Sequence, residues 1–239
     1  MSQCRTGLLG GTFNPVHRGH IELGLKIKAA FALDRILYIL SAQPPHKKKQ
    51  PMPAAELRLA MLTAALLPYP GLLPCDLELR RRGDSWTIDT IRSLKAENPD
   101  ERFYFITGSE GFLKIRTWKE YRRLLRGVFF IIVLRRANHR PKVEKLLREE
   151  GVPFGPECEN AAAPSAPGQT GPSAPRQSGP PAPRQTGPPA AFLLAYVSDY
   201  LELSATAIRK MISRGQDISP FVETNVLKIM EENKLYEEG

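Results

Sequence analysis

The 239-residue sequence is poor in cysteine: Cys4, Cys75 and Cys158 are far apart, and no Cys-x-x-Cys pair occurs. This spacing argues against a disulfide framework and a zinc site, and it is typical of a reducing compartment. Long apolar runs are also missing, since the strongest one, from Val128 to Leu134, is far too short to span a bilayer. The first residues contain no apolar signal core. We therefore expect a cytoplasmic protein with no membrane association.

The charge of the chain is not balanced. Lys and Arg number 34 against 25 Asp and Glu, which gives a formal net charge of +9. Such an excess favours an anionic partner, either a nucleotide, a nucleic acid or a membrane surface, although it also serves solubility. The length allows one large domain with a substantial buried core.

Apolar patterning predicts strands that alternate with helices. We expect strands at residues 5–9, 35–40, 73–79, 102–107, 128–134 and 192–197. We expect helices at residues 20–33, 54–67, 87–98, 118–125, 141–150, 203–214 and 219–235, the last one with Ser219 as its N-cap and Pro220 at its first position. Strand–helix–strand units of this length predict an α/β fold with an open parallel sheet.

The composition changes abruptly after about residue 155. Residues 164–187 are three copies of a Pro-rich octapeptide with no apolar side chain larger than proline. We interpret residues 156–190 as a disordered surface insertion in one domain, made of an α/β core at 1–155 and its completion at 191–239. A binding role for the Pro-x-x-Pro spacing stays open, and neutral repeat expansion in a tolerant loop is favoured.

The stretch from Gly7 to His20, Gly-Leu-Leu-Gly-Gly-Thr-Phe-Asn-Pro-Val-His-Arg-Gly-His, is the most informative part of the sequence. Glycines after a strand allow close approach of a ligand, and the following helix N-terminus offers free N–H groups to phosphate. His17 and His20 add further donors. The glycines alone could form only a tight turn, but the appended His-x-x-His favours a phosphate site.

A second phosphate-binding pattern occurs near the C-terminus. Ser204 and Thr206 are placed at a predicted helix N-terminus, and Arg209 follows one turn later. Alone, this pattern could be a capped helix with a surface arginine. Four distinctive stretches follow predicted strands, and in a parallel sheet they would meet at one edge; these stretches are residues 10–20, 43–49, 108–110 and 204–209.

The sequence Gly10-Gly-Thr-Phe-Asn-Pro-Val-His-Arg-Gly-His20 resembles the signature of the nucleotidyltransferase superfamily. Within it, the chain is similar to the bacterial nicotinate (nicotinamide) mononucleotide adenylyltransferases, over about residues 5–150 and 192–236. The resemblance implies a Rossmann-like open parallel sheet with helices on both faces and a small C-terminal helical part. It also implies transfer of AMP from ATP to nicotinate mononucleotide.

Several further stretches carry this resemblance. Pro44-Pro-His-Lys47 resembles the family's Pro-x-His-Lys loop, and Arg82-Gly-Asp-Ser-Trp-Thr87 resembles its Arg-x-Gly-x-Ser-Tyr-Thr turn. The helix with Ser204, Thr206 and Arg209 resembles the Ile-Ser-Ser-Thr-x-Ile-Arg motif, with departures at Leu203 and Ala205. Glu110 stands where the family has Asp.

The resemblance implies three groups of site residues. The expected catalytic residues are His17, His20 and Arg209. The expected ATP-binding residues are Gly10, Gly11, Thr12, Phe13, Gly108, Glu110, Arg135, Ser204 and Thr206. The expected mononucleotide-binding residues are Asn14, His46, Lys47, Ser85, Trp86, Thr87 and Trp118, although either tryptophan could instead serve core packing.

The expected products are deamido-NAD and pyrophosphate, formed by in-line attack without a covalent enzyme intermediate. We expect Mg²⁺ to bridge the ATP phosphates, held mainly by phosphate and water, because no carboxylate cluster suggests a protein metal site. The preference between nicotinate and nicotinamide stays open, because it rests on whether backbone donors near Trp86 and Trp118 meet a carboxylate. A homo-oligomer stays open as well.

Three alternatives compete with this hypothesis. A sister phosphopantetheine adenylyltransferase or cytidylyltransferase would share the first motif but not the Pro-His-Lys loop, Trp118 or the Arg209 helix. Ala205 and Glu110, which depart from the family motifs, would suit a non-catalytic nucleotide-binding module. Retention of both histidines argues against that alternative. Nucleic-acid binding is disfavoured because the basic residues are scattered and form no groove-reading motif.

Overall fold

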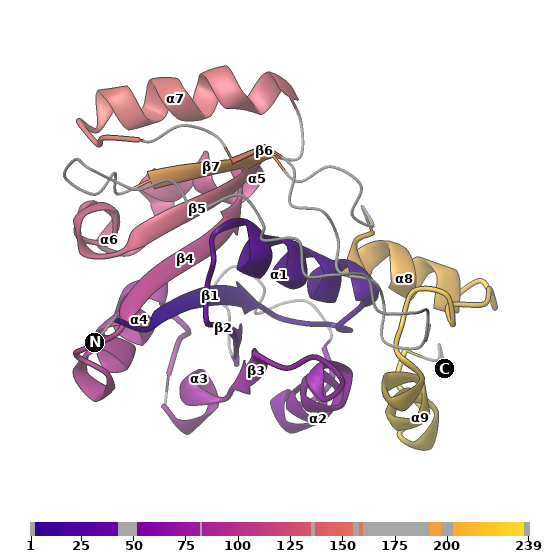
Figure 1. Cartoon of the computed structure of the whole chain (residues 1–239). Coiled ribbons are helices and arrows are strands. Elements are labelled where there is room, and N and C mark those ends of the chain that lie inside the picture. The colour runs from indigo at the N-terminus through magenta and orange to yellow at the C-terminus, as the bar shows by residue number, and fades with distance from the viewer. Residues whose placement is uncertain are drawn as a thin grey trace, which may run out of the picture.

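The computed structural model describes residues 3–42, 52–81, 83–134, 137–154, 158–159, 192–196 and 203–236. Its sheet is parallel throughout, with the strand order β3-β2-β1-β4-β5-β7-β6 (Figure 1). The strands are β1 (Arg5–Gly11), β2 (Arg35–Leu40), β3 (Leu72–Cys75), β4 (Arg102–Gly108), β5 (Phe129–Leu134), β6 (Cys158–Glu159) and β7 (Phe192–Tyr196). The predicted α/β class with an open parallel sheet is confirmed.

Helices connect these strands and follow the last one. They are α1 (Arg18–Ala30), α2 (Ala55–Leu66), α3 (Leu77–Arg80), α4 (Thr87–Glu97), α5 (Ser109–Phe112), α6 (Tyr121–Gly127), α7 (Arg140–Glu149), α8 (Ala205–Ile212) and α9 (Thr224–Glu232). Two 3₁₀ turns, η2 (Ile115–Thr117) and η3 (Ala137–His139), complete the described elements.

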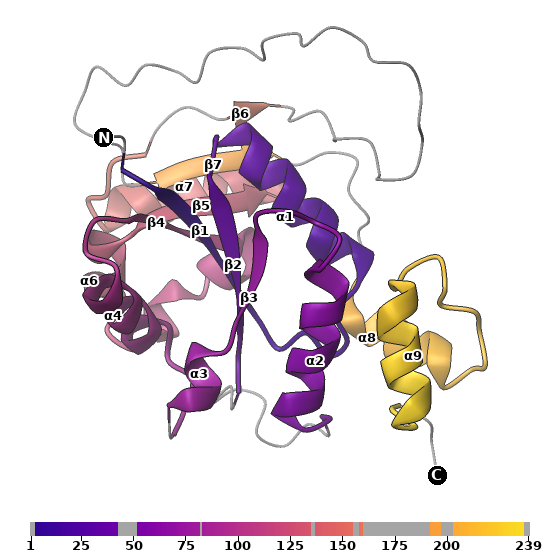
Figure 2. The same ribbon diagram turned by 60° about the horizontal axis from the view of Figure 1, so that its bottom comes forward.

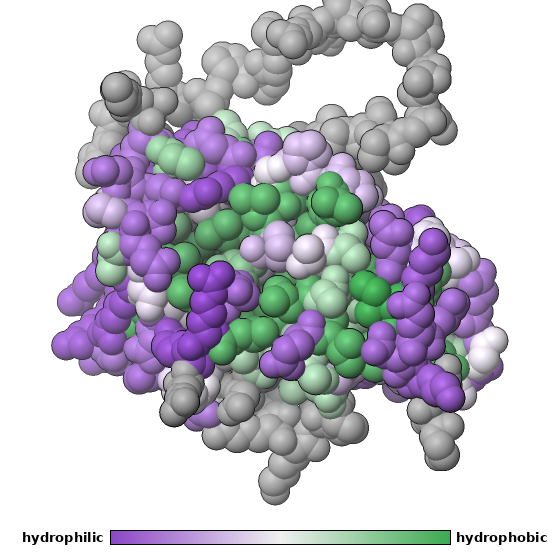
Figure 3. Space-filling model, turned by 90° about the horizontal axis from the view of Figure 1, so that it is seen from below, coloured by the Kyte–Doolittle hydropathy of each residue, from purple (hydrophilic) through white to green (hydrophobic). Residues whose placement is uncertain are grey.

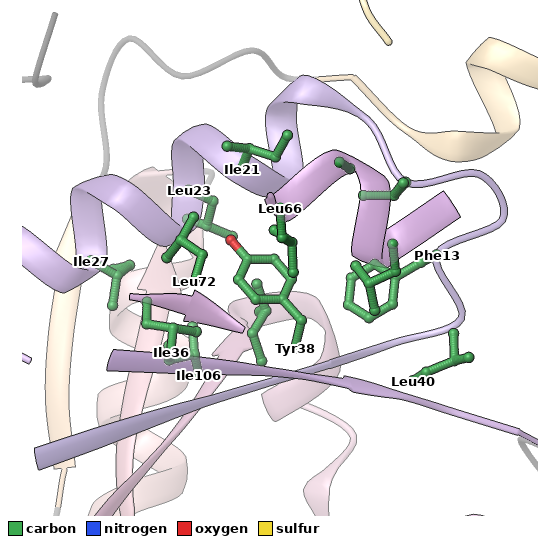
Figure 4. Close-up of a cluster of buried hydrophobic side chains, with 14 of the residues drawn as sticks. Phe13, Ile21, Leu23, Ile27, Ile36, Tyr38, Leu40, Leu66, Leu72 and Ile106 are labelled. Carbon is green, nitrogen blue, oxygen red and sulfur yellow. The ribbon is translucent and has the colours of Figure 1, made fainter. Parts of the chain in front are cut away.

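Two hydrophobic cores lie on opposite faces of the sheet. Alternate residues of one strand enter different cores, since Leu8 belongs to one and Leu9 to the other, as the two-residue period of a strand requires. The first core joins the sheet to α1, α2, α8 and α9, and Figure 4 shows its centre around Tyr38. The second core joins the opposite face to α4, α5, α6 and α7. Helices therefore cover both faces, as predicted.

The order of the strands reverses beside β1. The chain builds outward from β1 through β2 to β3, and then returns to place β4 on the other side of β1. At such a switch point the loops after neighbouring parallel strands diverge and leave a crevice at the carboxyl edge of the sheet. The segments after Gly11 and Gly108 leave the sheet at this edge.

The C-terminal segment, residues 203–236, returns to the N-terminal half of the chain. Figure 2 shows α9 beside α2. The Tyr69 hydroxyl donates to Glu223 Oε1 at 3.1 Å, and the Arg18 backbone N–H donates to Phe221 O at 2.9 Å. These contacts join the small C-terminal helical part to α1 and to the chain after α2.

Two predicted elements differ from the structure. The predicted strand at 73–79 ends at Cys75, because Asp76 begins a helical turn in which the Leu79 N–H bonds to its carbonyl and Arg80 pairs with its carboxylate. The predicted helix at 219–235 begins only at Thr224, because Ser219 donates from its N–H and hydroxyl to Asp217 in a turn.

One predicted helix is divided in the structure, and the predicted insertion is described only in small part. Where one helix was predicted at 118–125, a 3₁₀ turn ends before Trp118 and α6 begins at Tyr121. Most of the predicted 156–190 insertion lies outside the described residues, so the division at 1–155, 156–190 and 191–239 stays a prediction.

Polar side chains do not cover the surface evenly. Figure 3 shows apolar residues gathered in the middle of one face and polar ones on its flanks. The exposed large hydrophobic residues of the described chain are Leu67 after α2 and Leu73 on the edge strand β3. No helix in the described ranges is long and apolar enough to cross a membrane.

Candidate active site

A cavity of about 350 Å³ lies where β1 ends and α1 begins. Its walls are the turn after β1, the first turn of α1 and the N-terminus of α8, and its lining includes Gly11, Thr12, Phe13, Asn14, His17, His20, Ser204, Ala205, Thr206 and Arg209. No Asp or Glu is among the described residues that line this cavity. Two helix N-termini, two imidazoles and a guanidinium therefore face one space, which suits an anion.

The two histidines lie against each other at the start of α1. Their ring centroids are 3.7 Å apart, and the His17 backbone N–H donates to His20 Nδ1 at 3.3 Å. His17 is 4% exposed at the N-cap position, and the rings of His20 and Phe13 pack edge-to-face with their centroids 5.2 Å apart. The bond to Nδ1 makes that nitrogen an acceptor, so Nε2 of a neutral His20 carries the proton.

The N-terminus of α8 holds Arg209 in a fixed position. Ser204 caps the helix by accepting a hydrogen bond from the Ala207 N–H at 3.1 Å. Arg209 donates from Nη2 to Thr206 Oγ1 at 3.2 Å and from Nη1 to the Asn14 carbonyl at 2.6 Å. The guanidinium is thus oriented before any ligand arrives, which reduces the entropy lost on binding.

A second cavity, of about 360 Å³, adjoins the first one. Both cavities are lined by Gly11, Thr12, His20 and Leu23. The second cavity extends across the switch point to Gly10, Ser85, Thr87, Thr107, Gly108 and Trp118. A Cβ added at Gly10 would meet no protein atom within 4 Å, so the missing side chain leaves room for a ligand beside the strand end.

Trp118 packs against the second core and also lines the second cavity. Its ring packs edge-to-face against Phe105, with centroids 5.9 Å apart and planes at 87°, and it also lines the second cavity. An aromatic ring fixed in this way offers a flat apolar wall to a planar ligand.

Asn14 is held by two side chains from the C-terminal segment. Its carbonyl accepts from Arg209, and its Oδ1 accepts from the Tyr236 hydroxyl at 2.7 Å. Burial raises the pKa of the Tyr236 hydroxyl, so that it remains a donor across the physiological range. The turn after β1 is therefore fixed by residues near the other end of the sequence.

The structure does not bring every predicted residue to these cavities. Trp86 packs against the second core, and Lys119 Nζ lies 5.9 Å from the centroid of its ring. Trp86 lines neither cavity, although its neighbours Ser85 and Thr87 line the second one. Glu110, on α5, also lines neither. His46, Lys47 and Arg135 lie outside the described residues. Their roles stay predictions.

Tyr236 and Arg58, which hold the turn after β1, were missed from the sequence. Tyr236 acts through a side-chain hydroxyl, and Arg58 acts through bonds to the carbonyls of Thr12 and Ser41. Neither belongs to a motif with a recognised chemistry. An arginine in the first turn of a helix, where its charge opposes the helix dipole, was the only available signal for Arg58.

Comparison with known proteins identifies the family of this chain. A family model described as "Cytidylyltransferase-like" matches residues 8–211. A protein of Geobacter metallireducens named "Probable nicotinate-nucleotide adenylyltransferase" is 32% identical, with 97% of this chain and 98% of the relative covered. A protein of the same name from Desulfatibacillum aliphaticivorans is also 32% identical, with 97% and 99% covered. The chain belongs to the nicotinate-nucleotide adenylyltransferase family.

A solved structure of low sequence identity shows the same fold. The Plasmodium falciparum nicotinic acid mononucleotide adenylyltransferase complexed with NaAD superposes with a TM-score of 0.68 at 17% identity, covering 98% of this chain and 97% of that one. At this identity the likeness concerns the fold alone. It agrees with the parallel sheet and helix layers described above.

Proposed function

We propose that the protein transfers AMP from ATP to nicotinate mononucleotide, giving deamido-NAD and pyrophosphate. The observation that carries this proposal is the position of His20, which lines both cavities. One cavity has the donors that phosphates need, and the other has the flat wall of Trp118. Two substrates bound in these cavities would meet beside His20, and the names of the relatives agree with this pair of substrates.

The reaction needs alignment and charge neutralisation more than acid–base chemistry. The 5′-phosphate of the mononucleotide is already an anion at neutral pH and can attack the α-phosphorus in line, so no covalent enzyme intermediate is required. His17, His20 and Arg209 then stabilise the charge that gathers on the leaving pyrophosphate. Arg209 is suited to this task because Thr206 and Asn14 already hold its guanidinium.

The remaining predicted residues divide between the two substrates. The loop from Gly10 to Phe13, with Gly108, Ser204 and Thr206, would bind ATP, and Glu110 and Arg135 are proposed for its adenosine side. Asn14, Ser85, Thr87 and Trp118 would bind the mononucleotide, together with His46, Lys47 and Trp86.

We further propose that Mg²⁺ enters bound to ATP. No group of three or more His, Cys, Asp or Glu side chains gathers in the described part of the chain, and the first cavity is lined by donors rather than carboxylates. This donor set fits a polyphosphate and leaves the metal to phosphate and water ligands. When bound, the ion neutralises phosphate charge. We propose that this reaction takes place in the cytoplasm, in keeping with the few separated cysteines.

The test measures pyrophosphate release with Mg²⁺ and ATP, offering nicotinate and nicotinamide mononucleotides in parallel, with CTP replacing ATP as a nucleotide control. Turnover that favours nicotinate and requires ATP supports the proposal. Equal use of both mononucleotides would retain the chemistry but contradict the specificity. Pyrophosphate release with CTP alone, or no release with either nucleotide, would contradict the proposed function.

The role of Arg209 is tested separately. Arg209→Met should lower kcat by about 100-fold, as expected when one preorganised donor to developing charge is lost. Lys210→Met is the matched control, because Lys210 is the next residue of α8 and is exposed. Equal activity of the two variants would contradict the assignment.

A further inference from the structure

Arg58 is the largest fully buried side chain of the described protein. It lies in the first turn of α2 and is 2% exposed. This is an unfavourable place for a cation, because the N-terminus of a helix is already positive and burial removes hydration. Burial accordingly lowers the pKa of the Arg58 guanidinium from its ordinary value. Such a residue needs strong partners to be retained there.

Its partners are four backbone carbonyls from two loops, the turn after β1 and the connection from β2 to α2. Nη1 donates to Thr12 O at 2.8 Å and to Ser41 O at 2.9 Å. Nη2 donates to Ala42 O and Nε to Pro53 O, both at 3.1 Å. Thr12 follows β1, Ser41 and Ala42 follow β2, and Pro53 lies just before α2. One planar guanidinium therefore reinforces the contact between these two loops, which are also joined where the Ser41 N–H donates to the Gly11 carbonyl at 2.8 Å. The point charge of lysine could not bond to the same carbonyls equally.

The loops joined in this way form the walls of the candidate site. Thr12 lines both cavities and Ser41 lines the second. The carbonyl of Thr12 belongs to the peptide that enters Phe13, whose φ of 43° lies in the left-handed region that non-glycine residues rarely adopt. Arg58 bonds to the carbonyl just before this residue, and Arg209 bonds to that of Asn14 just after it. The unusual backbone is thus held on both sides.

We propose that Arg58 is a positioning residue, which fixes the phosphate-binding turn at Thr12 against the loop that begins at Ser41. The inference rests on the proposed function, since it assigns these two loops to the two substrates. In this role Arg58 does not need to contact the substrate. This role explains why a charged group is buried behind the site, where an apolar residue would remove one donor from each of four carbonyls.

The test uses two variants of Arg58 and one control. Arg58→Met keeps the length of the side chain and removes every donor, whereas Arg58→Lys keeps the charge and loses the planar fork. Arg35→Met is the control, because Arg35 is partly buried at the opposite end of β2 and bonds to Thr6 Oγ1 at 3.2 Å and to Glu101. Pyrophosphate release gives kcat and KM for each substrate, calorimetry gives the affinity for a non-hydrolysable ATP analogue, and thermal unfolding reports stability.

Arg58→Met should lower kcat/KM by about 100-fold, the scale expected when a binding loop shifts by about 1 Å, with a raised KM for the mononucleotide. Arg58→Lys should fall between this variant and the wild type. Arg35→Met should lower the melting temperature and leave kcat/KM within about twofold of the wild type. Wild-type kinetics in Arg58→Met would overturn the proposal. The proposal would also be overturned if Arg35→Met lost as much kcat/KM as Arg58→Met while the two variants had the same melting temperature.

The two proposals can fail separately. If the wild type releases no pyrophosphate, the proposed function fails, and the Arg58 inference is then decided by calorimetry alone. Weaker binding of the ATP analogue to Arg58→Lys than to Arg35→Met would support it, and equal binding would overturn it. Arg58→Lys also serves if Arg58→Met does not fold.

Discussion

Replacing Gly24 by alanine should destabilise the protein, although alanine is the better helix former. Gly24 lies inside α1, where the substitution would ordinarily stabilise a helix by up to about 1 kcal/mol. A Cβ at this position, however, would lie 1.9 Å from the Tyr38 hydroxyl oxygen and 3.0 Å from its Cζ. An ordinary contact is 3.4–4 Å, so the hydroxyl or the helix must move by about 1.5 Å in a close-packed interior.

The magnitude follows from what Tyr38 does. Its side chain is fully buried, and its hydroxyl donates to the His20 carbonyl at 2.9 Å; Figure 4 shows the ring in the middle of the first core. Overpacking costs about 1–3 kcal/mol. Loss of a buried hydrogen bond costs a further 1–3 kcal/mol or so. After the gain in helix propensity, the free energy of unfolding should fall by roughly 1–5 kcal/mol.

Urea unfolding measures this change as a lower midpoint at an unchanged slope. Gly127→Ala is the matched control, because Gly127 ends α6 and a Cβ there meets nothing within 4 Å. Tyr38→Phe removes the clashing oxygen, so Gly24→Ala should cost clearly less in that background. The reasoning is refuted if Gly24→Ala is as stable as Gly127→Ala, or if its cost is the same with and without the hydroxyl.

Two further predictions concern residues outside the cavities or behind them. The pKa of Glu120 is lowered to about 2 by its hydrogen bonds to Arg92 and Arg123, so its stabilising contribution is present above the unfolded value of 4.5 and lost as the pH falls through 2. Glu120→Gln should therefore lower the melting temperature at pH 7 and lower it much less near pH 2; a pH-independent difference would contradict this. Tyr236→Phe removes the hydroxyl that holds Asn14 Oδ1, and should lower the free energy of unfolding by about 1–2 kcal/mol in urea and raise KM, whereas unchanged kinetics would show that the turn needs no such support.

Much of the fold could be predicted because strands and helices alternate at clear periods. Continuous apolar runs such as residues 128–134 indicated buried parallel strands, and parallel strands bring their following loops to one edge. The error at 73–79 has a physical cause: Leu73, Cys75, Leu77 and Leu79 alternate like a strand, yet the ion pair of Asp76 with Arg80 belongs to a helical turn. Periodicity alone does not detect such a change within one short segment.

The candidate site was only partly predictable for a related reason. Side chains that bind a ligand, such as His20 and Arg209, belong to patterns with a recognisable chemistry. Arg58 instead bonds to four backbone carbonyls. Because every residue has a backbone carbonyl, these four acceptors cannot be recognised from the sequence. Tyr236 reaches Asn14 across 222 positions of the chain, a pairing that only the tertiary structure reveals.

This long-range pairing has a consequence for biosynthesis. A ribosome adding about 5–20 residues each second needs on the order of ten to forty seconds to travel from Asn14 to Tyr236. The nascent chain can pair β1 with β2 and β4 long before then, and Arg58 can bond to the Thr12 carbonyl, but the two bonds to Asn14 form only after Arg209 and Tyr236 emerge. Chains that stop early would keep most of the sheet and lack these bonds, so the turn is complete only after translation has passed the last helix, α9.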